Sequence, residues 1–287
     1  MKTRGVAAAI CAALLLAGCT KTAVVEDPAA AAASEAAKAR ESVPTTVPSS
    51  TPPQPVTAPP QPASLTKHKI YGAGRMTARC PEPKIEPSSL ATVRAYYAAS
   101  VTCLNKAWEP TIRSAGFAFT PPKLIVVIGQ SPDSPCDVSD SYGYYCGDTI
   151  YLDAQSDLDR YREDPEWAFG WAAFLIAHEY GHHIQAITGI SKAFGERALK
   201  LNGVDLALEE SRRFELQASC FAGVYFGANR DFRPGWAELF AEVVESTGDP
   251  RYDHGNAKNH ARWANAGFRT ANPSACNTFA APSAQVS

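Results

Sequence analysis

Apolar side chains recur three and four positions apart in several long stretches of the chain, and this spacing predicts α-helices. We expect helices over these ranges: Ser88 to Ala115, Pro165 to Thr188, Val204 to Phe226, Trp236 to Ser246 and Asn256 to Phe268. Two shorter runs are predicted strands, Lys123 to Ile128 and Thr149 to Leu152. The pattern therefore predicts an α+β domain that is mainly helical and contains a small β-sheet.

The predicted helix from Pro165 to Thr188 is apolar on both sides, which indicates that it is buried. It contains the pattern HExxH, from His178 to His182. Positions four apart lie about 40° apart around a helix, so the two histidines project from one face and can hold one metal ion. Glu179 is then placed to accept a proton from water. His183 lies about 100° further round, and we expect it to bond to the main chain or to water.

A catalytic zinc site takes three protein ligands, and Glu215 is our candidate for the third. It is the one acid in the otherwise small or apolar segment from Phe214 to Gly223, and an embedded acid needs a partner. The other acids between His182 and Glu215 are Glu196, Asp205, Glu209 and Glu210. The last two lie beside arginines, where we expect a solvated charged face.

The first 66 residues differ in character from the rest. Lys2 and Arg4 precede an apolar stretch too short to span a bilayer, which ends at Leu16-Ala17-Gly18-Cys19. This ending is a lipobox and resembles bacterial lipoproteins, in which a signal peptide, here residues 1–18, is removed and Cys19 carries the lipid. An ordinary signal peptide is the alternative. Both interpretations place the domain outside the cytoplasm, and the first anchors it to the bacterial cell membrane.

Residues 19–66 are predicted to be the lipidated cysteine followed by a disordered linker rich in alanine, proline, serine and threonine, because they contain no aromatic residue to begin a core. The remaining residues, 67–287, are enough for one domain with a substantial core. They contain six cysteines, an even number that suggests three disulfides in an exported protein, with fifteen possible connectivities. Our preferred pairs are Cys80–Cys103, Cys136–Cys146 and Cys220–Cys276.

Three blocks of sequence resemble the bacterial family of putative neutral zinc metallopeptidases. The first runs from Ile176 to Gln185 and the second from Glu215 to Gly223. The third comprises His254-Gly255, Arg262-Trp263, Gly267-Phe268 and the stretch from Ala275 to Phe279. The resemblance implies a zincin-like fold, in which helices surround a small sheet and the HExxH helix lies beneath an edge strand. It also implies one Zn²⁺ held by His178, His182 and Glu215.

The resemblance gives roles to two further residues. In zincins with a glutamate ligand, the residue four positions later points at the same site, and the family's usual aspartate there is Ser219 in this chain. A serine can accept a hydrogen bond from a ligating histidine, but without charge, so activity is expected to be weaker. His254, from the third block, is a candidate catalytic residue that stabilises an oxyanion, or alternatively a hydrogen-bonding residue within the fold.

We therefore expect an extracytoplasmic zinc metallopeptidase that hydrolyses peptide bonds in peptide or protein substrates, with Glu179 as general base. The alternatives are a zinc-binding pseudopeptidase or structural lipoprotein of the cell envelope, a binding domain without metal, and a peptidase of peptidoglycan cross-links. The formal net charge of −2 and the lack of a basic block or phosphate-binding loop exclude nucleic-acid binding.

Overall fold

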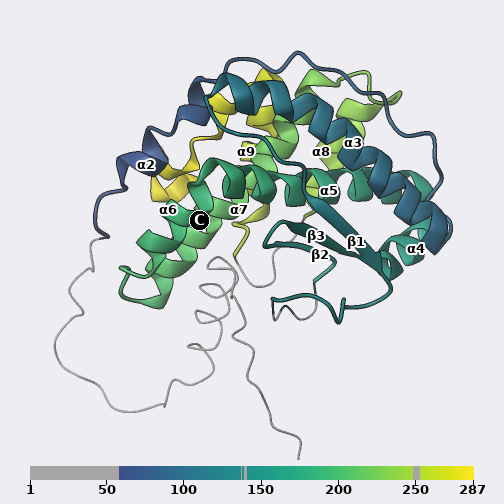
Figure 1. Cartoon of the computed structure of the whole chain (residues 1–287), viewed down its shortest axis with the longest axis horizontal. Helices are drawn as coiled ribbons and strands as arrows, with labels where there is room; N and C mark the ends of the chain where they lie inside the picture. The colour runs from purple at the N-terminus through teal and green to yellow at the C-terminus, as the bar shows by residue number, and fades with distance from the viewer. Residues whose placement is uncertain (1–57, 137, 139–140, 248–252) are drawn as a thin grey trace, which may run out of the picture.

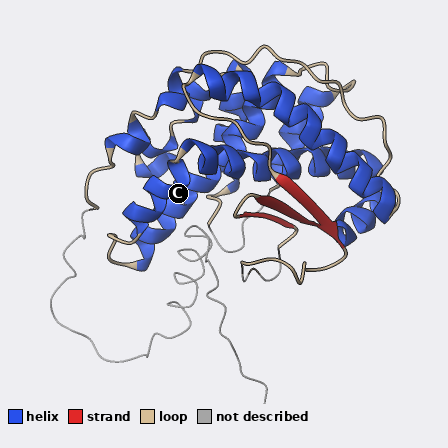
Figure 2. Ribbon diagram, in the orientation of Figure 1, coloured by secondary structure: helices blue, strands red, loops and turns tan. Residues whose placement is uncertain are grey.

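The computed structural model describes residues 58–136, 138, 141–247 and 253–287. The expected signal peptide, Cys19 and most of the expected linker lie outside these residues. The described part is mainly helical, as expected, and contains a three-stranded sheet (Figures 1 and 2). Its main elements are α2 (Ala63–Thr66), α3 (Leu90–Ser114), β1 (Lys123–Val127), β2 (Gly143–Cys146), β3 (Thr149–Asp153), α4 (Ala154–Glu163), α5 (Pro165–Thr188), α6 (Ile190–Ala198), α7 (Val204–Ala228), α8 (Trp236–Ser246) and α9 (Ala257–Thr270). Short 3₁₀ turns η1 (Lys69–Gly72), η2 (Pro273–Cys276), η3 (Thr278–Ala280) and η4 (Ser283–Gln285) complete it.

The ends of α5, the helix that carries HExxH, follow from local sequence. The Asp164 side chain accepts hydrogen bonds from two main-chain N–H groups of the first turn, and Pro165 stands at the first helical position, where its missing N–H costs nothing. At the other end Gly189 adopts a left-handed conformation, φ 86°, that stops the helix. Both ends of α5 agree with the predicted range.

The sheet has the strand order β1-β3-β2, with β1 parallel and β2 antiparallel to β3. Alternate residues of the strands face opposite sides. Ile150 and Leu152 of β3 pack into the main helical core, whereas Tyr151 packs with the Cys136–Cys146 disulfide in a small second cluster. The helices lie on one side of the sheet (Figure 2). Because β2 is an edge strand in contact with α5, the expected placement of the HExxH helix beneath an edge strand is confirmed.

The helix α7 lies between α5 and α9 and approaches both of them very closely. A Cβ atom at Gly181 of α5 would lie 2.8 Å from the main chain of Ala218 in α7. On the other side, a Cβ at Gly223 of α7 would lie 2.0 Å from the carbonyl oxygen of Ala264, and one at Gly267 of α9 would lie 2.1 Å from that of Cys220. Glycine is therefore required at these three positions, and the contacts bring the second and third sequence blocks against the HExxH helix.

Three disulfides join distant parts of the domain, and they are the pairs that the sequence analysis prefers. Cys80–Cys103 ties the segment before α3 to that helix, and Cys136–Cys146 ties a loop to β2. Cys220–Cys276 connects α7 to η2, with a Cα–Cα distance of 5.5 Å. Disulfides persist in oxidising compartments, so they support an extracytoplasmic location.

Residues 58–66, which the sequence analysis assigns to the linker, pack against the domain in the structure. Leu65 of α2 is fully buried. The carbonyl oxygens of Pro59 and Pro60 accept hydrogen bonds from Arg197 of α6. These contacts bury polar and apolar groups together, so this part of the segment belongs to the fold.

The same contacts overturn the expectation of a solvated face at Glu209 and Glu210. Glu210 is 2% exposed; its carboxylate pairs with Arg197 at 3.0 Å and accepts a hydrogen bond from Gln61. Glu209 is half-buried and pairs with Arg213 at 2.6 Å. The prediction was wrong because the segment before α2 covers Glu210 and the C-terminal turns cover Arg213, and both segments are remote in sequence.

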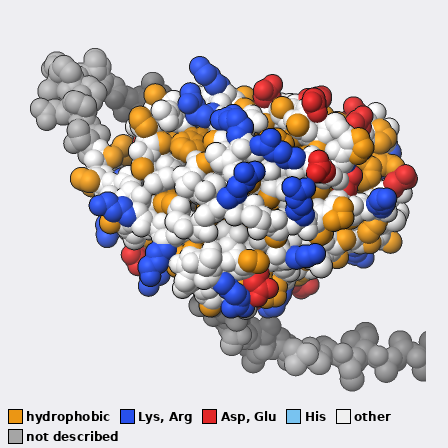
Figure 3. All heavy atoms as spheres, turned by 90° about the horizontal axis from the view of Figure 1, so that it is seen from above, with side chains coloured by type: hydrophobic (Ala, Val, Ile, Leu, Met, Phe, Trp, Pro, Cys, Tyr) orange, Lys and Arg blue, Asp and Glu red, His pale blue; other side chains and the backbone are white. Residues whose placement is uncertain are grey.

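The surface carries charges of both signs. Figure 3 shows a face on which Lys and Arg side chains are spread among polar and apolar atoms, with Asp and Glu side chains around them. One open depression of about 390 Å³ lies along α9, between Glu245 and the basic residues Lys258, Arg262 and Arg269. Within the described part of the chain, no helix combines the length and the apolar character needed to cross a membrane.

Candidate metal centre

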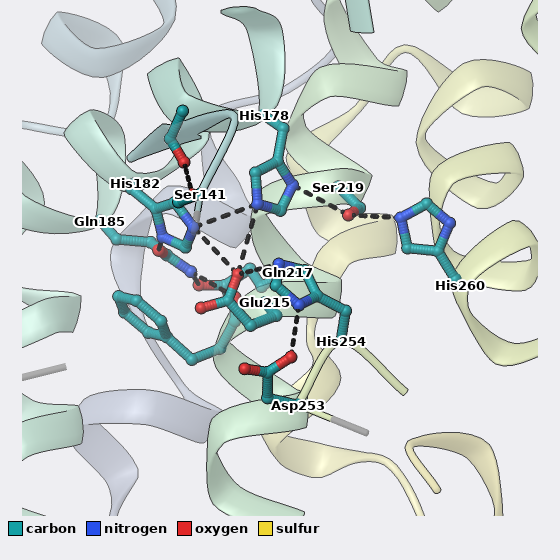
Figure 4. A network of polar contacts seen from close by, with 12 residues as sticks. Ser141, His178, His182, Gln185, Glu215, Gln217, Ser219, Asp253, His254 and His260 are labelled. Atoms are coloured by element: carbon teal, nitrogen blue, oxygen red, sulfur yellow. Dashed lines mark hydrogen bonds and ion pairs between the residues drawn. The ribbon is translucent and has the colours of Figure 1, made fainter. Parts of the chain in front are cut away.

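Two histidines of α5 and one glutamate of α7 converge in the interior of the domain (Figure 4). His178 Nε2 lies 3.2 Å from His182 Nε2 and 3.3 Å from Glu215 Oε2, and His182 Nε2 lies 3.0 Å from the same oxygen. The histidines meet because they stand four positions apart on one helix. Glu215 reaches them because Gly181 lets α7 approach α5 closely.

The hydrogen bonds of Gln185 fix which nitrogen of His182 carries the proton. The Gln185 Nε2 group donates to the Phe214 carbonyl at 2.8 Å and to Gln217 at 3.1 Å. Its Oε1 atom is therefore the one that faces His182 Nδ1, at 2.8 Å, and must accept a hydrogen bond from it. In the neutral ring, Nε2 of His182 then presents a lone pair to Glu215 and His178.

The residues present fit a tetrahedral zinc ion. Zinc ligands lie about 2.0–2.1 Å from the metal, so ligand atoms at neighbouring corners of a tetrahedron lie about 3.3 Å apart. The three distances found here are 3.0, 3.2 and 3.3 Å. Two imidazole nitrogens and one carboxylate oxygen are also the donor set that zinc takes in catalytic sites, with a fourth position left for water or substrate.

The charges in the centre call for a cation between these atoms. Burial lowers the pKa of His178 to about 3, so its ring is neutral at pH 7. Burial also acts to lower the pKa of His182, but the Glu215 carboxylate outweighs it and raises that pKa to about 9. Burial opposes the charge of Glu215 as well, and the nearby histidines hold its pKa well below the usual value. A proton or a metal ion between the three groups compensates the buried negative charge of Glu215.

Glu179, the acid of HExxH, is 5% exposed and stands beside the edge strand β2. Burial raises its pKa to about 7, against the effect of His182 and of a hydrogen bond from the main-chain N–H of Tyr145. A carboxylate with a pKa near 7 can both accept and release a proton at neutral pH. Its environment therefore suits proton transfer.

His254 lies at the open side of the centre, as the third sequence block suggests. Its Nε2 atom is 3.2 Å from Glu215 Oε2, and its Nδ1 atom is 2.8 Å from Asp253 Oδ1. Burial works against its charged form, but Glu215 and Asp253 together raise the pKa of His254 well above its usual value. The structure thus brings His254 to Glu215 and to the ring of His178, whose centroid lies 5.5 Å from its own.

Ser219 lies on the far side of His178, where its Oγ atom is 3.0 Å from Nδ1 of that ring. The expectation for His183 is confirmed, because its Nε2–H group donates to the carbonyl of Thr120 at 2.7 Å, away from the centre. The Tyr145 hydroxyl donates to its other nitrogen at 3.2 Å. This bond pins the edge strand to α5.

Four residues of this environment were not predicted from the sequence: Gln185, Asp253, His260 and, through its main chain, Tyr145. Gln185 had a usable signal, because a residue three positions after His182 on a helix shares its face. Asp253 precedes His254 directly. For His260 and Tyr145 the sequence carries no such signal, since their partners, Ser219 and Glu179, lie 41 and 34 positions away on other elements.

Comparisons with known proteins agree with this geometry. Residues 77–238, more than half of the chain, match the family model described as "Putative neutral zinc metallopeptidase". The chain is 29% identical over 196 residues to the uncharacterized protein YpfJ of Escherichia coli K12, a match that covers 60% of this chain and 66% of that protein. It is 28% identical over 134 residues to the uncharacterized protein Rv2575 of Mycobacterium tuberculosis H37Rv, covering 38% and 44% of the two chains.

The chain thus spans just under two thirds of the length of YpfJ and less than half of Rv2575. No solved structure gives a significant match. The family model includes the HExxH helix and Glu215 on α7, and these are the elements that supply the three converging side chains. The chain belongs to the putative neutral zinc metallopeptidase family.

Proposed function

We propose that the protein is an extracytoplasmic zinc peptidase in which His178, His182 and Glu215 hold one zinc ion and Glu179 is the general base. The observation that carries the proposal is the convergence of three ligand atoms at the spacing of a tetrahedral site, beside a buried glutamate that has no use in a purely structural zinc site. Peptides are the substrate class because the family is one of peptidases.

A zinc ion in this centre would act as a Lewis acid that polarises the scissile carbonyl and lowers the pKa of a water molecule towards 7. Glu179 accepts the proton of the attacking water and delivers it to the leaving amine nitrogen. Burial gives its carboxyl the matching pKa, and the Tyr145 N–H group keeps the carboxylate turned towards β2. One group thus serves as base and then as acid.

His254 is the candidate for stabilising negative charge on the carbonyl oxygen. Asp253 accepts the hydrogen bond from Nδ1 and fixes the ring, so Nε2–H points into the centre. A donor aimed at the developing oxyanion lowers the barrier more than it stabilises bound substrate. In the absence of substrate the same group donates to Glu215, which is the alternative role expected from the sequence.

Zinc content and peptide cleavage, measured together, test the proposal. Glu179→Gln should keep one zinc per chain and lose about 10²–10⁴-fold in turnover, because the amide cannot accept the proton. Glu215→Ala should bind zinc far more weakly, since one of three ligands is gone. Glu196→Gln, at an exposed glutamate of α6, is the matched control and should change neither quantity.

Three outcomes would contradict different parts of the proposal. Undiminished cleavage by Glu179→Gln would remove the general base from the mechanism. Stoichiometric zinc without cleavage of any peptide by the wild type would favour the pseudopeptidase or structural lipoprotein. A wild type that binds no stoichiometric zinc would favour a binding domain without metal.

The location is the second part of the proposal. The disulfides support export, and the lipobox ending at Cys19 supports a lipid anchor on that residue, which lies outside the described part of the chain. The wild type should partition into the detergent phase of a membrane extract and incorporate labelled fatty acid, and Cys19→Ser should do neither. Unchanged partitioning and labelling of Cys19→Ser would refute the anchor.

A further inference from the structure

A chain of hydrogen bonds runs from His178 away from the metal centre and ends at the main-chain carbonyl of Val244. Figure 4 shows its first two links, from His178 to Ser219 and from Ser219 to His260. His178 Nδ1 lies 3.0 Å from Ser219 Oγ, and Ser219 Oγ lies 2.9 Å from His260 Nε2. The other nitrogen of His260, Nδ1, lies 3.0 Å from the carbonyl oxygen of Val244. Three helices supply the side chains, namely α5, α7 and α9, and α8 supplies the carbonyl.

The carbonyl end fixes the direction of every bond in this chain. A carbonyl oxygen only accepts, so Nδ1 of His260 is the donor. Burial lowers the pKa of His260 to about 4, and the neutral ring therefore has no hydrogen on Nε2. Nε2 must accept from the Ser219 hydroxyl, which leaves an Oγ lone pair to accept from His178 Nδ1–H.

The result is that Nε2 of His178 carries its lone pair towards Glu215 and His182, as a metal ligand requires. Water cannot replace the partners, because His178, Ser219 and His260 are 5%, 0% and 1% exposed. The ring of Phe174 also packs edge-on against His260, with centroids 5.5 Å apart, and limits its rotation. Solvent therefore does not reach this chain of hydrogen bonds, and packing holds its side chains in place.

The chain also bears on how well Ser219 accepts a hydrogen bond from His178. A serine hydroxyl that donates to one imidazole becomes a better acceptor for the other, because hydrogen bonds in a chain polarise each other by about 10–30% per bond. His260 thus strengthens the hydrogen bond that Ser219 accepts from His178.

We propose that His260 is a positioning residue for the candidate zinc ligand His178 and that it acts through Ser219. The inference rests on the ligand role given to His178 under the proposed function. It predicts that His260 affects zinc affinity only while the hydroxyl of Ser219 is present, although His260 contacts none of the three candidate ligands directly.

Zinc dissociation constants of the purified full chain, measured by competition with a chelator at one pH, test this inference. His260→Asn can still donate to the Val244 carbonyl but is too short to accept from Ser219. We expect a zinc dissociation constant about 10–100-fold higher than in the wild type, the usual cost of losing support behind a metal ligand. Ser219→Ala should show a loss in the same range. An unchanged dissociation constant in Ser219→Ala would also overturn the inference, because His260 is proposed to act through Ser219, and this outcome can be measured even if His260→Asn does not fold.

The double variant Ser219→Ala/His260→Asn decides whether the two residues act in series. If His260 acts through Ser219, the double variant binds zinc no more weakly than the weaker single variant. His260→Gln, whose longer side chain can place an acceptor near the position of Nε2, should keep most of the affinity. His68→Asn is the matched control. His68 also bonds to a main-chain carbonyl, that of Thr188, but it takes no part in the hydrogen bonds between His178, Ser219 and His260.

An unchanged dissociation constant in His260→Asn, additive losses in the double variant, or equal losses in His260→Asn and His260→Gln would each overturn the inference. A purely structural role would lower the melting temperature of the metal-free protein without this pattern of zinc affinities. Cleavage activity is not needed for the test. A wild type that binds zinc without cleaving peptides would reject the proposed peptidase, and the dissociation constants of the wild type and the variants would still decide the role of His260.

Discussion

At the scale of single residues, both histidines of the candidate metal centre have neutral hydrogen-bond partners. Gln185 accepts from His182, and Ser219 accepts from His178. A carboxylate in either position would raise the basicity of the imidazole more strongly. The formal charge of the donor set therefore comes from Glu215 alone.

A charged acceptor behind His178 should tighten zinc binding. We predict that Ser219→Asp lowers the zinc dissociation constant by about tenfold, because partners behind a metal-bound histidine contribute about 10–100-fold in affinity. Ser219→Asn, which has the same shape without the charge, is the control. Chelator competition on both variants provides the measurement, and equal dissociation constants for Asp and Asn would show that charge at this position is irrelevant.

Asp157 should make the free energy of unfolding depend on pH. It is buried and accepts a hydrogen bond from the Tyr97 hydroxyl at 2.6 Å, and burial raises its pKa from 3.8 to about 6. The folded protein holds a proton here that the unfolded chain releases above pH 4. This contribution to stability is therefore complete below pH 4 and is lost as the pH rises through 6, by up to about 3 kcal/mol.

Asp157→Asn removes this titration. Urea unfolding of metal-free protein at pH 4.5 and pH 7 should show that the variant gains stability relative to the wild type at the higher pH. Metal-free protein is needed because zinc binding itself depends on pH. The same stability difference between variant and wild type at both pH values would contradict the assignment.

At the scale of elements, the contact between α7 and α9 depends on glycines that let the two main chains touch. A Cβ at Gly223 would lie 2.0 Å from the carbonyl oxygen of Ala264. Both atoms are fixed to helix backbones, so this clash can be relieved only if the two helices move apart. We predict that Gly223→Ala lowers the free energy of unfolding by about 2 kcal/mol or more, although alanine favours a helix by about 1 kcal/mol.

Gly72→Ala is the control for this prediction, because nothing lies within 4 Å of a Cβ built at that position. Its effect should stay within about 0.5 kcal/mol. Denaturant unfolding of both variants provides the comparison. A Gly223→Ala variant as stable as Gly72→Ala would mean that α7 and α9 are further apart than the structure shows.

The helices with long apolar stretches or clear apolar periodicity were predictable from the sequence. The predicted ranges Pro165 to Thr188 and Trp236 to Ser246 agree with α5 and α8 at both ends. The elements that were not predicted include α2, which lies in the segment assigned to the linker, and α4, α6 and β2. The ten residues of α4 include five charged ones and almost no apolar period, α6 is short and contains Gly195, and β2 has only four residues, three of them half-buried.

The candidate site was predictable to the extent that its residues are neighbours on one helix. HExxH fixes the spacing of His178 and His182 without any knowledge of the fold. Glu215 needed the argument that an acid embedded among apolar residues has a partner. His260 was beyond prediction, because its role depends on where α9 packs, and α9 is placed by contacts between glycine backbones.

At the scale of the whole molecule, the disulfide Cys220–Cys276 holds the C-terminal turns against the helix that carries Glu215. It spans 56 positions of sequence, whereas Cys136–Cys146 spans 10. In the chain-entropy account, the longer loop contributes about 4 kcal/mol and the shorter one about 3 kcal/mol. We predict that the paired substitution Cys220→Ala/Cys276→Ala destabilises the domain more than Cys136→Ala/Cys146→Ala, as measured by denaturant unfolding. A larger loss of stability in Cys136→Ala/Cys146→Ala would show that loop length does not determine how much each disulfide stabilises the domain.

The N-terminal segment shows why the edge of the domain was misplaced. Proline-rich sequence without aromatic residues is typical of linkers, yet Pro59 and Pro60 accept hydrogen bonds from Arg197 through their carbonyls, a role that any residue can perform. The partner lies more than 130 positions away. Composition describes side chains, and these contacts are made by the main chain.

The central claim is that His178, His182 and Glu215 hold one metal ion. Anomalous scattering from crystals of the zinc-loaded protein, recorded on both sides of the zinc absorption edge, tests it most directly. We predict one zinc peak about 2.0–2.2 Å from Nε2 of both histidines and from Oε2 of Glu215. A zinc peak elsewhere in the protein, or none at this centre in saturating zinc, would contradict the account.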